Sequence, residues 1–116
     1  MKYLCLIYLD EKRFQALPKE ESDALWAECD ALALELQRQP GFIAADALEP
    51  TTMATTLRHR SGGVMVTDGP FAETKEQLAG FILIEAANLD DAIRIAARVP
   101  TARFGSVEVR PTRELH

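Results

Sequence analysis

The first strand of this chain is apolar on both of its faces, and this limits the folds open to it. Lys2–Leu9 is rich in Tyr, Leu and Ile, which favour strands. Both alternating sets are largely apolar: Tyr3, Cys5, Ile7 and Leu9 on one side, and Leu4, Leu6 and Tyr8 on the other. Such a strand needs cover on both faces. We expect helices over one face and a second subunit over the other.

The length and composition predict one globular domain over residues 1–116. The chain is 47% hydrophobic and 27% charged, and a domain of 116 residues buries enough surface to fold without a metal or a disulfide. The net charge of −5 argues against a nucleic-acid partner. No apolar run is long enough to cross a bilayer, and the charges of Asp10–Arg13 follow the first strand where a signal peptide would need a cleavage site. Cys5 and Cys29 suit buried thiols, so we expect a cytoplasmic protein without membrane contact.

Two helices are predicted between the strands. The first covers Pro18–Gln39, where Leu25, Cys29, Leu32 and Leu36 recur at helical spacing. Pro40-Gly41 ends it. The second covers Leu89–Arg98, with Asn88 as its N-cap and Pro100 after its end.

Five further segments have the composition of strands, and Ser61-Gly62-Gly63 reads as a hairpin turn between two of them. The order is close to the ferredoxin-like split βαβ plan with an extra strand in the middle, an α+β fold. The five segments are Phe42–Leu48, Thr52–Arg60, Val64–Thr67, Gly80–Ala86 and Ser106–Arg110.

The segment Val66–Phe81 contains a turn, Asp68-Gly69-Pro70-Phe71, directly after a strand. Asp68 has two interpretations. An aspartate before Gly-Pro is an ordinary turn former whose carboxylate accepts backbone N–H groups. A carboxylate at a strand end that faces an apolar cleft is instead a candidate general base.

Ordered segments along the whole chain resemble the DGPF-type branch of the YCII-related proteins. The resemblance implies a ferredoxin-like fold that pairs, sheet against sheet, into a dimeric α/β barrel, and hence a homodimer. The segments are Met1-Lys2-Tyr3-Leu4, Tyr8, Thr55-Thr56, Val66–Phe71, Glu73-Thr74-Lys75-Glu76, Gly80-Phe81 and Gly105–Pro111.

Two functional expectations follow from this resemblance. The broader group is similar to small enzymes such as a dehydrochlorinase, for which a His–Asp pair has been suggested as catalytic. This implies an unidentified small-molecule ligand and lyase- or isomerase-type chemistry near Asp68. Members of the DGPF branch often look like neighbours of extracytoplasmic-function sigma factors, which implies a regulatory or accessory partner as the alternative.

The remaining candidate ligand-binding residues are Tyr8, His59, Glu73 and Lys75. Tyr8 closes the first strand, where its hydroxyl could reach a cleft. Lys75 could bind an anionic ligand with Glu73 beside it, although Thr74 and Gln77 also fit a capping box that starts one helical turn. The histidines do not fit the suggested His–Asp pair, because His59 stands where the branch commonly has an apolar residue and His116 is the last residue. No sequence pattern indicates a metal site or a cofactor.

Overall fold

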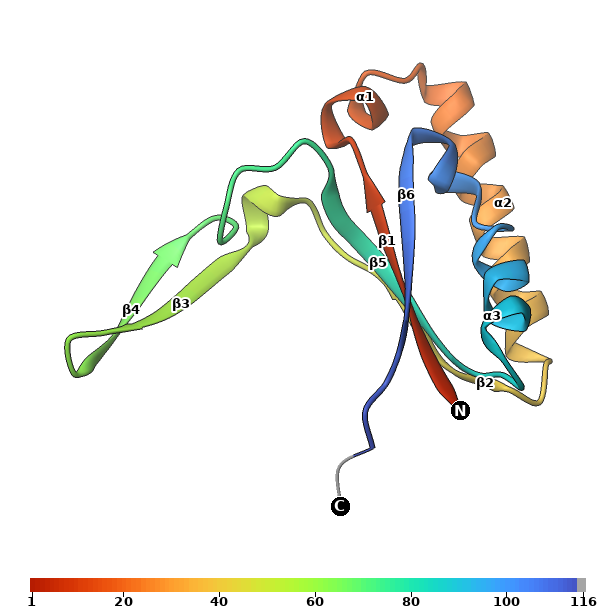
Figure 1. The fold of residues 1–116 in the computed structure, drawn as a ribbon. Coiled ribbons are helices and arrows are strands. Elements are labelled where there is room, and N and C mark those ends of the chain that lie inside the picture. The colour runs from red at the N-terminus through yellow and green to blue at the C-terminus, as the bar shows by residue number, and fades with distance from the viewer. Residues whose placement is uncertain (115–116) are drawn as a thin grey trace.

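The computed structural model describes residues 1–114 and has an antiparallel sheet with helices on one face (Figure 1). The central strands are β1 (Lys2–Leu9) and β5 (Gln77–Glu85), and the edge strands are β2 (Phe42–Ala47) and β6 (Gly105–Pro111). The order β2-β5-β1-β6, antiparallel throughout, is that of the ferredoxin-like split βαβ fold. The predicted α+β class is therefore confirmed.

The two predicted helices lie on the same face of the sheet (Figure 1). They are α2 (Lys19–Gln37), which follows Pro18, and α3 (Leu89–Ala96), whose N-cap Asn88 accepts a 2.9 Å hydrogen bond from the backbone N–H of Asp91. Three short helical segments were not predicted: α1 (Glu11–Gln15) and the 3₁₀ turns η1 (Thr51–Met53) and η2 (Pro100–Phe104). Each is too short to show an apolar period.

The core lies between the helices and one face of the sheet. Ile84 and Cys5 are the largest of its fully buried side chains. The expected helical cover over one face of β1 is present (Figure 1): Tyr3 and Cys5 point into this layer, together with Leu32, Leu36, Ile82, Ala92, Ala96 and Val99 from the other elements.

No helix within residues 1–114 covers the opposite face of the sheet (Figure 1). The strand registers place Leu4, Leu6, Phe81 and Leu83 side by side on this open face, and all four are half-buried. Charged side chains flank this apolar centre, with Asp46 on β2 and Glu108 and Arg110 on β6.

The hairpin predicted at Ser61-Gly62-Gly63 is present, and it adds two strands to the four-stranded ferredoxin-like plan where one extra strand was expected. β3 (Thr55–Arg60) and β4 (Gly63–Asp68) pair with each other, and the hairpin leaves the sheet on the side away from the helices (Figure 1). The turn lies where it was predicted: Ser61 and Gly62 have φ of 48° and 80°. The start of the predicted strand Thr52–Arg60 belongs instead to η1.

The predicted helical turn at Thr74 is also wrong. Gln77 already belongs to β5, and its side-chain amide donates a 2.6 Å hydrogen bond to the carbonyl oxygen of Thr74. The Thr74 hydroxyl donates to the carbonyl of Glu76 at 2.7 Å. The capping-box residues therefore stabilise a loop, because the side chains bind carbonyl groups rather than the N–H groups at a helix start.

Within the described residues, no helix is both long enough and apolar enough to cross a membrane.

Candidate functional site

A cleft of about 540 Å³ lies where the hairpin joins the sheet. The end of β1, the segment around η1, the base of the hairpin and the connection into β5 form its walls. The lining residues are mostly apolar or hydroxyl-bearing, as is common for small-molecule sites. They include Tyr8, Thr51, Met53, Thr56, Phe71 and Glu76.

Long-range hydrogen bonds hold these walls together. The side-chain oxygen of Gln77 accepts the backbone N–H of Glu11 at 2.9 Å. The Glu11 carboxylate in turn accepts the backbone N–H of Thr51 at 2.9 Å and its hydroxyl at 2.8 Å. Bonds to a carboxylate are among the stronger ones in proteins. These bonds therefore link β5, α1 and η1 behind the wall of the cleft.

The Asp68-Gly69-Pro70-Phe71 turn is fastened to β3. Gly69 donates its N–H to the carbonyl of Ala54 and accepts the hydroxyl of Thr56, both at 2.7 Å. Arg58 donates a 2.6 Å hydrogen bond to the carbonyl of Phe71. Gly69 has φ of +100°, a conformation that favours glycine. These contacts hold the turn in place and give it a structural role, which is to position Pro70 and Phe71 at the cleft.

Tyr8 and Glu76 bring polar groups to the cleft. Tyr8 lies on the open face of β1, directly opposite Ser106 of β6. The Ser106 hydroxyl donates a 2.8 Å hydrogen bond to Oε1 of Glu76. The half-buried Glu76 carboxylate is thus anchored beside Tyr8, and no group in residues 1–114 donates to its second oxygen. This carboxylate can accept a hydrogen bond or a proton from a ligand.

The structure places the predicted site residues in three different surroundings. Tyr8 lines the cleft, whereas Glu73 and Lys75 are exposed on the loop outside it. Asp68 is exposed and pairs with Thr55, which puts its side chain on the hairpin face opposite that of the cleft-lining Thr56. His59 lies near the tip of the hairpin.

The predicted site residues are therefore not gathered in one place, and their roles stay predictions. His116 lies outside the described residues. Glu76 was not among the site residues predicted from the sequence. Glu76 directly precedes β5, but the strand predicted from the sequence began only at Gly80, and the partner Ser106 is 30 residues away in the sequence.

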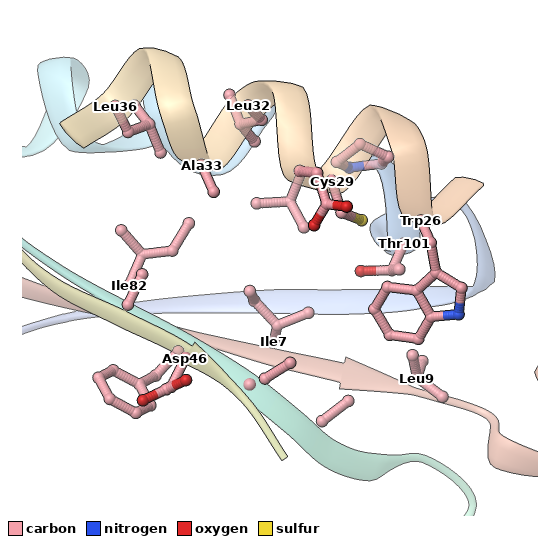
Figure 2. A pocket seen from close by; sticks show the side chains of 18 of the residues that line it. Ile7, Leu9, Trp26, Cys29, Leu32, Ala33, Leu36, Asp46, Ile82 and Thr101 are labelled. Carbon is pink, nitrogen blue, oxygen red and sulfur yellow. The ribbon is translucent and has the colours of Figure 1, made fainter. Parts of the chain in front are cut away.

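A second cavity, of about 330 Å³, lies between α2 and the sheet (Figure 2). Ile7, Leu32 and Ile82 point into it, while Asp46 points away on the other side of the sheet (Figure 2). Trp26 lies at one end, with its ring 5.4 Å from that of Phe14 in an edge-to-face contact. The cavity is an apolar space beneath the helix with few polar groups.

Among the described residues that line this second cavity, Cys29 is the one that carries a thiol. Burial raises the pKa of this thiol, and the carboxylates of Asp30 and Glu28 raise it further, against the opposing hydrogen bond from the backbone of Thr101. A thiol with a raised pKa is a poor nucleophile at neutral pH. Cys5, fully buried in β1, also has a pKa raised by burial. Both cysteines are free; Cys5 belongs to the core, and Cys29 is half-buried beside the cavity.

The fold and the cleft define a small α+β protein with a concave site at one end of an open sheet. The model of the YCII-related domain matches residues 1–116, and the chain belongs to the YCII-related family. The chain is 43% identical over 113 residues to the uncharacterized protein R00369 of Rhizobium meliloti (strain 1021), covering 96% of this chain and 91% of that protein.

A solved structure shares the fold. The 5-chloro-2-hydroxyhydroquinone dehydrochlorinase TftG from Burkholderia phenoliruptrix AC1100, determined in complex with 2,5-dihydroxybenzoquinone, is similar with a TM-score of 0.56. The match covers 97% of this chain and 94% of TftG at 15% sequence identity. At this identity the likeness extends to the fold alone.

Proposed function

We propose that this protein is a cytoplasmic, small-molecule-binding member of its family whose ligand occupies the cleft at the hairpin base, and that it acts as an enzyme of lyase or isomerase type. The observation that carries the proposal is the preformed cleft, in which Tyr8 and Glu76 meet an apolar wall. A few placed polar groups in an apolar hollow are the usual form of a small-molecule site. The dehydrochlorinase activity of TftG supports the chemical class by analogy of fold.

The proposed working unit is a homodimer that closes as an α/β barrel, sheet against sheet. Two surfaces support it. The open face of the sheet presents a row of half-buried apolar side chains that no element of residues 1–114 covers. In a two-fold symmetric dimer, each copy would cover the open face of the other with the same apolar row, so both rows would be buried.

The hairpin is the second surface that supports the dimer. Its outer face carries Leu57 and Val66, opposite each other in register and 62% and 63% exposed, with Val64 in the next pair. A two-stranded hairpin is marginally stable by itself. Contact with a second copy supplies the packing that the hairpin lacks, and would place Asp68 and His59 at the subunit boundary. Light scattering at micromolar concentration tests the dimer, and a monomeric mass would exclude it.

The role of Asp68 as a catalytic group is a separate part of the proposal. Asp68→Asn keeps the size and the turn-forming capacity of the side chain but removes its charge. If Asp68 acts as a base, turnover falls while folding is unchanged. Unchanged ligand binding and turnover in Asp68→Asn would leave Asp68 with a turn-forming role only.

The second candidate function is a non-catalytic partner of an extracytoplasmic-function sigma factor. The exposed apolar face of the hairpin favours it, because such a face can bind another protein as well as a second copy. Native co-purification with the sigma factor from the same operon separates the two functions. Failure to recover a complex would count against the regulatory function.

A further inference from the structure

We propose that the cleft selects an uncharged or cationic ligand with an apolar body and a hydrogen-bond donor, and that Glu76 accepts that donor. This inference rests on the proposed function, because it concerns the same cleft. It adds the chemical class of the ligand and the residue that recognises it.

The walls set the apolar part of the ligand. Rings and aliphatic side chains dominate them, and Phe71 is 74% exposed, so that a ligand body can cover its ring. Burial of apolar surface is favourable at roughly 25 cal/mol per Å². The apolar lining residues are Leu48, Pro50, Met53, Ala54, Pro70, Phe71, Ala72 and Leu78.

The charged side chains of the cleft determine which ligand charge is favoured. Among the described residues that line the cleft, the charged side chains are two carboxylates, Glu49 and Glu76. A third carboxylate, that of Glu11, lies behind the wall and binds Thr51. Glu76 is half-buried and Glu49 is exposed, so solvent screens part of their repulsion of an anionic ligand, but the negative charge still disfavours it.

Two cations lie nearby without lining the cleft. The Arg58 guanidinium is turned to the carbonyl of Phe71, and Lys75 is exposed on the loop between Thr74 and Glu76. Both offset part of the negative field, but neither offers a direct contact to a molecule in the cleft. The sequence suggested that Lys75 could bind an anionic ligand. Because neither cation contacts the cleft, an anionic ligand there would have no cationic partner among the described residues.

Glu76 sets the position of the donor. Ser106 holds its Oε1 oxygen, and the register places Tyr8 directly opposite Ser106. The second oxygen of Glu76 accepts the donor of the ligand, and the Tyr8 hydroxyl gives a further polar contact on the same side. A hydrogen bond to a carboxylate contributes more than a neutral one, so this contact dominates the orientation of a small ligand.

Three ligands with the same ring test the inference: benzylamine, benzyl alcohol and benzoate, which are cationic, neutral and anionic. Each is titrated into the full-length protein, and binding is followed by the backbone amide signals in ¹H–¹⁵N NMR spectra. We expect benzylamine and benzyl alcohol to shift the signals of Tyr8 and residues 74–78, with benzoate at least about tenfold weaker. Glu76→Gln should weaken benzylamine about tenfold. The matched control Glu73→Gln, which removes a carboxylate outside the cleft, should change it less than about twofold.

Several outcomes overturn the inference. Benzoate binding as tightly as benzylamine would exclude charge selection, and an unchanged benzylamine affinity in Glu76→Gln would exclude Glu76 as the acceptor. Absence of binding by both benzylamine and benzyl alcohol at millimolar concentrations would exclude the ligand class. The proposed function fails in a different way: the shifted signals would then gather elsewhere, for example around Cys29 and Thr101 in the cavity under α2.

Discussion

The hydroxyl of Ser106 on β6 donates a hydrogen bond of 2.8 Å to Oε1 of Glu76 on the connection before β5. This contact joins two segments that are not neighbours in the sheet, since β1 lies between β5 and β6. It fixes a carboxylate at the end of the open face, where the hydroxyl of Tyr8 is adjacent in register. The geometry of the cleft therefore depends on a side-chain contact across the central strand.

Ser106→Ala should loosen Glu76 without unfolding the protein. The bond is exposed, so the free energy of unfolding should fall by only about 0.5–1 kcal/mol. Benzylamine affinity should fall about two- to fivefold, because the carboxylate loses its anchor but keeps its charge. Urea denaturation and NMR titration measure the two effects. Ser106→Thr, which keeps the hydroxyl, is the control, and an equal loss of affinity in both variants would argue against an anchoring role.

The outer face of the hairpin should decide the oligomeric state. Val66→Lys places a charge between Leu57 and Val64 on the face proposed for the dimer contact, and should raise the dimer dissociation constant at least about tenfold. Met65→Lys is the matched control. Met65 is 54% exposed on the same strand, but on the opposite face of the hairpin.

Analytical ultracentrifugation over a range of concentrations compares these two variants. We expect dissociation in Val66→Lys and little change in Met65→Lys. Equal behaviour of both would show that the outer face of the hairpin does not specify the contact.

Much of the fold could be predicted because its signals are local. The composition of Lys2–Leu9 predicted a strand with the observed bounds, although not which of its two apolar faces the helices would cover. Asn88 caps α3 as expected, because a cap uses residues that are close in sequence. The helical turn predicted from Thr74 and Gln77 was wrong, because in the folded protein these side chains bind carbonyl groups and no helix starts there.

The site was harder to predict because its contacts are long-range. Tyr8 could be proposed from the end of a strand, but Glu76 acquires its role only through Ser106. The position of Asp68 on one face of the hairpin depends on the pairing with Thr55, and the sequence offered no way to tell which face lines the cleft. The sequence shows which residue types lie near one another along the chain, but not which of them the sheet brings together in space.

Gly105 should be the glycine least tolerant of substitution near the cleft. A Cβ at this position would lie 2.0 Å from the carbonyl oxygen of Tyr8, an impossible contact with the backbone of β1. Gly105→Ala should therefore lower the free energy of unfolding by about 1–3 kcal/mol or more, because β6 must shift. Gly63→Ala is the control, since its Cβ would meet its nearest neighbour at 3.9 Å. Urea denaturation checks the pair, and equal stability of both variants would show that β6 and β1 are not so closely packed.

The two thiols should make stability fall at alkaline pH. Burial raises the pKa of both Cys5 and Cys29 in the folded state above the ordinary value of 9.0. Below that value both states hold the protons and the contribution to stability is complete. As the pH rises above it, the unfolded chain loses its thiol protons first, so the free energy of unfolding falls by up to about 1.4 kcal/mol per pH unit for each thiol. Cys5→Ala and Cys29→Ala should each reduce this slope, even where the lost packing lowers stability at every pH. Urea denaturation between pH 7 and 10 measures the slope, and an identical slope in wild type and both variants would contradict the raised pKa values.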